Sequence, residues 1–367
     1  MYSIKNYIDR GSLFLRNNFF PGRKRLSTLM IYATDLCNSK CKHCQVWAKK
    51  PKQNLSFDSI QKIIKSKVVA KNTVIGLEGG EFLLHPRAKE IMDFLDKNHP
   101  KYDLLSNCVQ PDRTINAIKN HNPMRLFVSL DGTPETHATM RGNDCYNSVI
   151  KVIEACKDKI PVSVMFTLTP YNSFNDLIHV CKICKELNID LRVGIYNNMP
   201  FFDTLDKAHS IENINDKCPD IQSAGYIKNI PEEVKNFSEN YDFMVLYDYW
   251  RKGNLFLKCN SIFDSIIILP NGDVPICQNL SLKLGNVNQQ PLHEILNSST
   301  TIKHQKEHKK NCNKCWINFH RKYDVILYRS AEKFGGRLFA EMILGKYNWN
   351  SNSKKTYKQI FKNKISE

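Results

Sequence analysis

Three cysteines lie close together near the start of the chain, in the segment "CNSKCKHC" over 37–44. Spacings of four and three residues allow a compact loop to turn the sulfurs of Cys37, Cys41 and Cys44 inward. A tetrahedral zinc site needs a fourth ligand, and His43, fixed beside Cys44, could hardly reach the same ion. A [4Fe–4S] cluster takes one ligand per iron, so three cysteines would leave one iron open. The motif predicts a metal site, with zinc or a structural cysteine cluster as alternatives to iron.

A second polar motif follows the apolar run over 73–78. The segment "EGGEFLLHP" places Gly79, Gly80 and Glu81 at the end of this run. Glycines allow the backbone to approach a ligand closely, and a carboxylate can pair with an ammonium group. Alone, these residues indicate a loop. Behind the three cysteines, they indicate a ligand site.

The spacing Cys37-x3-Cys41-x2-Cys44 after a first strand resembles the signature of the radical S-adenosylmethionine (SAM) superfamily. The resemblance implies a [4Fe–4S] cluster whose open iron is chelated by the amino and carboxylate groups of SAM. An electron from the reduced cluster then cleaves SAM into methionine and a 5′-deoxyadenosyl radical. The resemblance also places His43 against the adenine, and the segment Gly79, Gly80 and Glu81 on the methionyl amine.

Polar residues end two further apolar runs. Asn107 follows in "LLSNC", Ser129 and Asp131 follow in "VSLDG", and Arg141 lies in the next segment, "HATMRG". The family resemblance implies that Asn107, Ser129 and Arg141 contact the ribose and carboxylate of SAM. The segment around Asp131 equally fits an ordinary turn.

A second cysteine set lies near the C-terminus and consists of Cys259, Cys277, Cys312 and Cys315. Two ligands from a hairpin and two from a tight loop can surround one metal centre, and the spacing alone leaves zinc open. The set resembles the auxiliary-cluster domain called SPASM, or twitch when shortened. Arg321 stands where the full form has a further cysteine, and no cysteine follows Cys315. The resemblance therefore implies one auxiliary [4Fe–4S] cluster, closed by four thiolates, that passes electrons.

The elements that position these residues alternate along 28–200. Six short apolar runs, rich in β-branched residues, indicate buried parallel strands, and amphipathic segments between them indicate helices, one with Ser56 as its N-cap. Strand–helix repeats imply right-handed crossovers and a parallel sheet. Six repeats are fewer than the eight of a closed barrel. We predict an α/β fold with a partial (β/α)6 barrel, whose functional residues lie at the carboxyl ends of its strands.

The pattern divides the chain into five segments. We predict an N-terminal extension (1–27), the radical SAM partial barrel (28–200), a linker or bridge region (201–255), a twitch- or SPASM-like iron–sulfur domain (256–320), and a C-terminal helix with a basic tail (321–367). Within the fourth segment, "SIIILPNGDVPICQ" (265–278) predicts a β-hairpin of two apolar strands. A helix is expected after this hairpin, over 291–308. The apolar pattern of the last helix is broken at Gly335 and Gly336.

Composition and charge restrict the possible partners and the cellular location. Among 367 residues, 53 Lys and Arg exceed 36 Asp and Glu, which gives a net charge of +17. This charge fits an acidic partner, or reflects a chain rich in Lys, Asn and Ile throughout. No nucleic-acid motif is present, and peripheral membrane contact by the last helix is not favoured. Asp9 and Arg10 fall where a signal peptide needs an apolar core. We therefore expect a cytoplasmic protein, in which thirteen cysteines do not form a disulfide framework and the clustered ones bind metal or serve redox roles.

These expectations combine into a radical SAM enzyme of oxidoreductase type, with SAM and two [4Fe–4S] clusters as cofactors. The radical abstracts hydrogen from a C–H bond, the auxiliary cluster accepts an electron, and a flavodoxin or ferredoxin supplies the first electron. The expected substrate is a small sugar-like or anionic molecule, with a ribosomal peptide as the alternative. A non-catalytic zinc-binding protein is the alternative from another class. The sequence points to no catalytic side chain.

Overall fold

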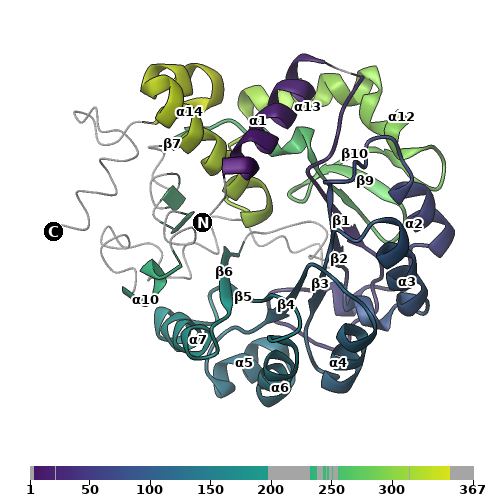
Figure 1. Cartoon of the computed structure of the whole chain (residues 1–367), viewed down its shortest axis with the longest axis vertical. Helices are drawn as coiled ribbons and strands as arrows, with labels where there is room; N and C mark the ends of the chain where they lie inside the picture. Colours follow the sequence, from purple (N-terminus) through teal and green to yellow (C-terminus); the bar gives the residue numbers. More distant parts are fainter. Residues whose placement is uncertain are drawn as a thin grey trace.

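The centre of the fold is a curled sheet of seven parallel strands. The structure is a computed structural model that describes residues 4–20, 22–196, 232–237, 243–244, 246–247, 250, 255–313 and 315–347. The strand order is β6-β5-β4-β3-β2-β1-β8 (Figure 1). The strands are β1 (Thr28–Tyr32), β2 (Val74–Glu78), β3 (Tyr102–Ser106), β4 (Arg125–Ser129), β5 (Val162–Leu168), β6 (Asp190–Ile195) and β8 (Ser265–Ile268). The predicted partial barrel is confirmed, with one strand more than the sequence predicts.

Helices from the crossovers cover the outer face of this sheet (Figure 1). They are α2 (Phe57–Ile64), α3 (Ala88–Asn98), α4 (Pro111–Asn120), α5 (Pro134–Arg141), α6 (Tyr146–Cys156) and α7 (Phe174–Glu186). The Ser56 hydroxyl caps α2 by accepting a 3.0 Å hydrogen bond from the Ser59 N–H. A capping box of Ser173 and Asp176 starts α7. These local signals fix where α2 and α7 begin.

The two faces of the sheet meet different surroundings because side chains alternate along each strand. In β1, Leu29 and Ile31 are fully buried in the core between the sheet and the helices. Met30 and Tyr32 lie on the other face, in a smaller cluster that includes Phe319. The inner face of the curled sheet is thus free to line cavities.

The hairpin predicted over 265–278 is wrong in its pairing. The strand β8 adds to the barrel sheet as a parallel neighbour of β1, from Thr28 opposite Ser265 to Ile31 opposite Ile268. The chain then turns at Gly272, whose φ is 86°, into β9 (Asp273–Cys277), which pairs with β10 (Leu280–Asn286). All four residues of β8 are buried. An apolar strand of this kind is better covered at the edge of the barrel sheet than in a two-stranded hairpin.

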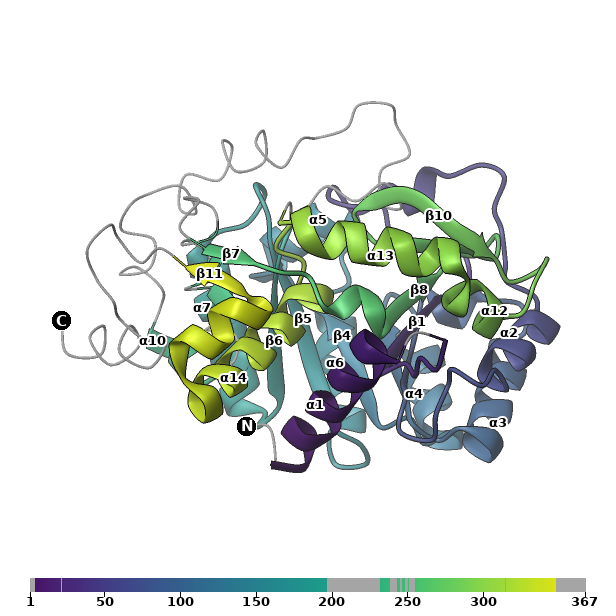
Figure 2. The ribbon, with the colours of Figure 1, turned by 90° about the horizontal axis from the view of Figure 1, so that it is seen from above.

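The remaining elements lie outside the seven-stranded sheet. They are α1 (Ile4–Phe19), α10 (Glu232–Lys235), β7 (Leu255–Leu257), α12 (Leu292–Asn297), α13 (Ser299–Asn311), α14 (Asn318–Leu344) and β11 (Gly345–Tyr347). The helix α1 lies beside α14 (Figure 2). A kink at Gly336, with a φ of 79°, divides α14 as the sequence predicts. The helix predicted over 291–308 is instead two helices that meet at Ser298. None of the described helices is long and apolar enough to cross a membrane.

Candidate active site and metal centres

A cavity of about 260 Å³, here the main cavity, lies at the carboxyl ends of the barrel strands. Segments after β1, β2, β3 and β4 contribute to its wall, together with β6, Gln278 and the residues at the start of α14. Ten residues predicted to bind the first cluster or SAM line it, namely Cys37, Cys41, His43, Cys44, Gly79, Gly80, Glu81, Asn107, Ser129 and Arg141. The structure therefore brings the whole first set of candidates to one place. Their roles as ligands and cofactor contacts remain predictions.

The end of α5 fixes one side of the three-cysteine loop. The N–H groups of Lys40 and Lys42 donate to the carbonyls of Arg141 and Met140, at 3.0 and 2.9 Å. The helix α5 then ends at Gly142, which adopts a left-handed conformation with a φ of 64°. A Cβ atom at this position would lie 2.8 Å from the Lys40 carbonyl oxygen. This glycine therefore permits the close contact between the helix end and the loop.

The residues after β2 hold the other side of the loop. The N–H groups of Gly80 and Glu81 donate to the carbonyls of Thr34 and Leu36, each at 2.7 Å. A Cβ atom at Gly80 would lie 2.2 Å from the Leu36 carbonyl oxygen. Gly79 has a φ of 148°, which L side chains rarely adopt. The two glycines are thus required for the close approach of two backbones.

The three thiols lie in surroundings that fit an iron–sulfur cluster. Burial raises the pKa of Cys37 to about 11 and that of Cys44 to about 12. The Arg141 Nη1 atom lies 3.8 Å from the Cys41 sulfur, and the Asn107 Nδ2 atom lies 3.9 Å from the Cys37 sulfur. Such buried thiols give up their protons when a metal supplies the positive charge. The surrounding N–H groups can then stabilise the negative charge on the sulfurs.

Two buried polar atoms in this cavity have no partner in the described part of the chain. The Oε2 atom of Glu81 accepts a 2.7 Å hydrogen bond from the Asn107 N–H, whereas Oε1 is unpaired. Burial raises the pKa of Glu81 to about 7. The Nδ1 atom of His43 is also unpaired, and burial lowers the pKa of this ring to about 4. Buried polar atoms rarely remain unpaired, so both atoms fit contacts with a bound ligand such as SAM.

Asp131 positions Arg141 rather than lining the main cavity. Its Oδ2 atom lies 2.6 Å from both Nε and Nη2 of Arg141. The Thr167 N–H donates to the other carboxylate oxygen at 3.2 Å. Burial opposes ionisation of Asp131, but the Arg141 guanidinium outweighs it and holds the pKa of Asp131 below its usual value. The pair therefore presents a fixed, permanently charged guanidinium to the cysteine loop.

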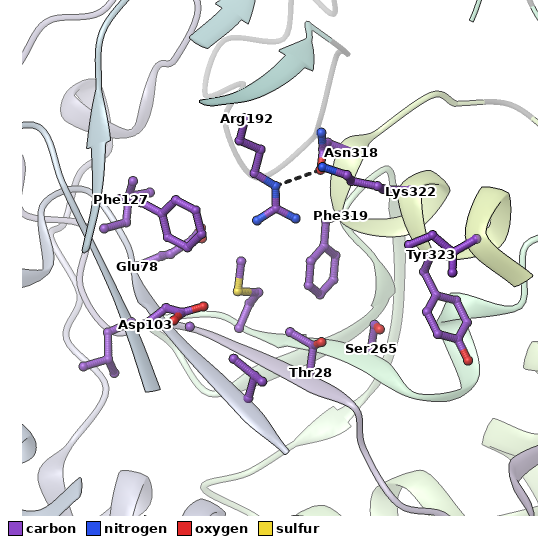
Figure 3. A pocket seen from close by; sticks show the side chains of 16 residues that line it. Thr28, Glu78, Asp103, Phe127, Arg192, Ser265, Asn318, Phe319, Lys322 and Tyr323 are labelled. Atoms are coloured by element: carbon purple, nitrogen blue, oxygen red, sulfur yellow. Dashed lines mark hydrogen bonds between the residues drawn. The ribbon is translucent and has the colours of Figure 1, made fainter. Parts of the chain in front are cut away.

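A second cavity of about 80 Å³, here the inner cavity, lies between the inner face of the sheet and α14 (Figure 3). It shares lining residues with the main cavity, among them Glu78, Phe127, Arg192 and Phe319. The two cavities therefore meet at these side chains.

Arg192 is held at this junction. Its Nε donates a 3.0 Å hydrogen bond to Asn318, and its guanidinium lies 5.5 Å from the centre of the Phe127 ring. Its terminal nitrogens point into the inner cavity, with Glu78 and Asp103 on the neighbouring wall (Figure 3). Burial raises the pKa of Glu78 to about 7 and that of Asp103 to about 6. The inner cavity thus combines charges of both signs with aromatic walls.

Sequence reasoning missed Glu78, Asp103 and Arg192. Asp103 and Arg192 each interrupt a short apolar strand, whereas Glu78 ends one. A charged residue at one alternate position of such a strand indicates that one face of the sheet is polar. This signal was available for Arg192 in "DLRVGI" and for Asp103 in "YDLLSN".

The second cysteine set lines another, smaller cavity. Its four members are Cys259, after β7; Cys277, at the end of β9; Cys312, at the end of α13; and Cys315, before α14. Burial raises the pKa of Cys277 to about 12 and also raises that of Cys259 and Cys315. All four cysteines of the set are free. The structure therefore brings the four predicted ligands together, and their role as ligands remains a prediction.

Arg321 and His320 complete the wall of this cavity. Arg321 is fully buried, and its guanidinium donates to the Cys315 carbonyl, the Leu257 carbonyl and the Asn313 side chain, at 2.9, 2.6 and 2.8 Å. Arg321, which stands where the longer domain form has a cysteine, is thus a buried cation that connects the loop at Cys315 to β7. Burial lowers the pKa of His320 to about 3, so this ring is neutral.

Comparison with known families identifies the superfamily. The model of the radical SAM superfamily matches residues 31–200, and the model of an iron–sulfur cluster-binding domain, SPASM, matches residues 259–316. The chain belongs to the radical SAM superfamily. Members of this superfamily that carry a SPASM domain bind SAM and [4Fe–4S] clusters, and these are the cofactors of this radical SAM protein. The iron–sulfur match also favours iron over the zinc alternative.

Two kinds of relative share part of its sequence. The subtilosin biosynthesis protein AlbA of Bacillus subtilis is 26% identical over 275 residues, which cover 72% of this chain and 58% of AlbA. A GTP 3′,8-cyclase of Synechocystis sp. is 26% identical over 171 residues, which cover 43% of this chain and 51% of the cyclase. The chain thus spans between half and three fifths of the length of these relatives.

Solved structures of two radical SAM proteins share its fold. Streptococcus suis SuiB bound to the precursor peptide SuiA superposes with a TM-score of 0.55 at 14% identity, over 81% of this chain and 70% of SuiB. The protein anSMEcpe bound to AdoMet and the Kp18Cys peptide superposes with a TM-score of 0.57 at 18% identity, over 92% and 98% of the two chains. At such identities the likeness establishes the fold alone.

Proposed function

We propose that this radical SAM protein is a maturase that modifies a ribosomally made peptide. The observation that carries this proposal is the likeness to AlbA, a bacteriocin biosynthesis protein. It covers 72% of this chain, more than the radical SAM match over residues 31–200 accounts for. The likeness to GTP 3′,8-cyclases covers less than half of the chain. The comparisons therefore favour a peptide over the small sugar-like or anionic molecule that we expected first.

The residues of the main cavity would hold the cofactor in place. When bound, the first cluster and SAM supply a 5′-deoxyadenosyl radical that removes a hydrogen atom from the substrate. Cys37, Cys41 and Cys44 would be the cluster ligands. The unpaired Oε1 atom of Glu81 would accept a hydrogen bond from the methionyl ammonium. The neutral ring of His43, which lies edge-on to Tyr196 with 6.3 Å between ring centres, would contact the adenine.

Further contacts with SAM would come from the ends of β3 and β4. The side chains of Asn107 and Ser129 both reach the main cavity, and Gly79 and Gly80 allow the backbone to approach the ligand. Arg141, fixed by Asp131, would attract the carboxylate of SAM.

The inner cavity would receive part of the substrate. Its aromatic walls, Phe127 and Phe319, exclude water from one side, while Arg192, Glu78 and Asp103 offer donors and acceptors on the other. A peptide side chain that extends from the main cavity would meet both surfaces. Its charged or polar end would then fix which carbon atom faces the radical.

The cluster held by the second cysteine set would carry an electron, because four thiolate ligands leave no iron open for direct binding of substrate. None of the described residues that line the cavities could reduce the first cluster. We therefore include a one-electron donor protein, of flavodoxin or ferredoxin type, among the partners.

The proposal is tested on protein purified and reconstituted without oxygen. Iron and sulfide are counted, and 5′-deoxyadenosine is assayed after addition of dithionite and SAM. A variant with Cys37, Cys41 and Cys44 all changed to Ala is the matched control. We expect about eight irons in the wild type, and loss of about half of them in the variant together with all SAM cleavage.

The substrate class is tested separately. The chain is produced together with each short peptide encoded beside its gene, and the peptide mass is measured. We expect one peptide to lose hydrogen in the presence of the wild type and to remain unchanged with the cysteine variant. SAM cleavage with no modified peptide would reject the peptide substrate and favour a small sugar-like or anionic substrate instead. Bound zinc with no cleavage would reject the enzyme itself.

A further inference from the structure

His320 lies in the first turn of α14, which separates the main cavity from the cavity of the second cysteine set. Phe319, its neighbour in the chain, lines the main and inner cavities. His320 faces the opposite way and lines the cavity of Cys259, Cys277, Cys312 and Cys315. Only 1% of the side chain is exposed to solvent.

The orientation of the His320 ring is fixed from one side. Its Nδ1 atom lies 2.7 Å from the Ser261 hydroxyl oxygen. Ser261 belongs to the short helix η3 (Ser261–Phe263), and its hydroxyl is 3.6 Å from the Cys259 sulfur. When this hydroxyl donates to Nδ1, the ring carries its proton on Nε2.

The other ring nitrogen is the one that has no partner. The Nε2 atom of His320 is buried and makes no hydrogen bond within the described chain. Leaving a buried donor unpaired is unfavourable, because the group loses its hydrogen bonds to water. The cavity is lined by the four cysteines, by apolar side chains such as Ile262 and Ile276, and by Asn279, His308 and Arg321, and Nε2 makes no hydrogen bond to any of them. A partner for Nε2 is thus to be sought in whatever the four cysteines hold.

We propose that His320 donates a hydrogen bond from Nε2 to a sulfur of the auxiliary cluster and thereby raises the reduction potential of that cluster. This inference rests on the proposed function in one respect, namely that the four cysteines hold a [4Fe–4S] cluster. A hydrogen bond to a cluster sulfur stabilises the reduced state, which carries more negative charge. His320 is therefore a positioning and tuning residue, and the role of cluster ligand stays with the cysteines.

Arg321, the charged residue beside His320 on this wall, acts differently. Its nitrogens already donate to two carbonyls and to Asn313, so its contribution to the cluster is a nearby positive charge. Removing Arg321 would leave these buried acceptors unpaired and would loosen the loop at Cys315. Substitution of His320 leaves this network intact, which makes the effect of one donor measurable.

The test measures a potential on a single cluster. Cys37, Cys41 and Cys44 are changed to Ala, so that only the auxiliary cluster is present in the full chain. The midpoint potential is measured by a mediated titration followed by electron paramagnetic resonance. We expect His320→Phe, which has no donor, to lower the potential. The side-chain amide of His320→Gln can still donate, so we expect its potential to lie between those of the wild-type residue and His320→Phe. We expect Ser261→Ala to shift the potential in the same direction as His320→Phe.

A second measurement detects the hydrogen bond itself rather than its effect on the potential. Histidine is labelled with ¹⁵N in the same cysteine variant, and the reduced cluster is examined by pulsed electron–nuclear spectroscopy. We expect a weak ¹⁵N coupling that persists in His308→Gln, which alters the other histidine of this wall, and that disappears in His320→Gln. An unchanged potential in His320→Phe at equal iron content, or no ¹⁵N coupling, would overturn the inference. A strong coupling that marks direct iron ligation would also overturn it.

Iron content separates this failure from failure of the proposed function. If the cysteine variant binds about four irons, the auxiliary cluster exists and the test of His320 is valid. If it binds none, the four cysteines do not hold a cluster. The proposed hydrogen bond and the proposed electron-transfer role would then both be rejected.

Discussion

The side-chain amide of Gln278 donates a 2.6 Å hydrogen bond to the hydroxyl group of Tyr32. Gln278 follows Cys277 of the second cysteine set, whereas Tyr32 ends β1 and lies on the inner face of the barrel. The Tyr32 hydroxyl in turn hydrogen-bonds to Glu78. A continuous chain of polar groups therefore joins the second cysteine set to the junction of the main and inner cavities.

Glu78 is expected to make stability depend on pH. Burial raises its pKa from 4.5 to about 7, against the effects of Arg192 and the Tyr32 hydroxyl. The folded chain thus binds this proton more tightly than the unfolded chain does. Stability from this group is complete below pH 4.5 and is lost as the pH rises through about 7, by about 3 kcal/mol in all. Glu78→Gln should therefore raise the melting temperature relative to wild type at pH 8 more than at pH 5.

Thermal unfolding between pH 5 and pH 8 checks this prediction. The matched control is Glu90→Gln, which removes an exposed carboxylate that pairs with Arg87 on the surface. This control should change the melting temperature little, and by similar amounts at both pH values. An equal effect of Glu78→Gln at pH 5 and pH 8 would show that Glu78 has an ordinary pKa in the folded chain.

Gly80→Ala is expected to remove the first cluster selectively. The new methyl group would meet the Leu36 carbonyl oxygen at 2.2 Å and the Cys37 Cβ at 2.9 Å, and both belong to the cysteine loop or its start. Because backbone atoms cannot move aside cheaply, the loop must shift. Iron content should fall from about eight to about four per chain. Gly194→Ala is the control, since its nearest neighbour would be 3.6 Å away and iron content should stay at the wild-type value.

Much of the site could be predicted because the strand ends are marked in the sequence. Each apolar run stops at polar or small residues, such as Glu81, Asn107 and Ser129, and parallel strands bring these ends to one edge. The ten predicted residues of the main cavity need only this shared direction to meet. Among the four C-terminal cysteines, the spacing of Cys312 and Cys315 restricts where their sulfurs can lie, whereas Cys259 and Cys277 reach them only through the fold.

Other features depend on contacts that no local pattern encodes. The strand β8 has the same apolar character whether it pairs with β9 or with β1. Its pairing with β1 depends on the open edge of the barrel sheet, which no local pattern reveals. Glu78 and Arg192 lie far apart in the sequence, and only the curl of the sheet turns both toward one cavity. Asp131 resembles a turn residue until the structure places Arg141 against it.

The ion pair of Asp131 and Arg141 is expected to be strongly coupled. Asp131→Asn should destabilise the fold by about 3–5 kcal/mol, because it leaves the Arg141 charge buried without its partner. Arg141→Gln should have a similar effect, and the double variant should cost clearly less than the sum. Denaturant unfolding of the four proteins measures this coupling. Asp93→Asn, in an exposed pair with Lys89, should change stability by less than about 1 kcal/mol. Additive effects of the two buried substitutions would contradict the coupling.

Glu81→Gln is expected to weaken the binding of SAM while leaving the cluster in place. The Oε2 atom is engaged by the Asn107 N–H, so the free Oε1 atom is the one available to an ammonium group. A hydrogen bond to a charged group contributes about 1.5–3 kcal/mol, which corresponds to a loss of about 10- to 100-fold in affinity. Equilibrium dialysis of labelled SAM against reconstituted protein measures it, with iron content as a check. Methylthioadenosine, which has no methionyl amine, should bind wild type and variant equally. If its affinity fell as much as that of SAM, Glu81 would be shaping the cavity rather than recognising the amine.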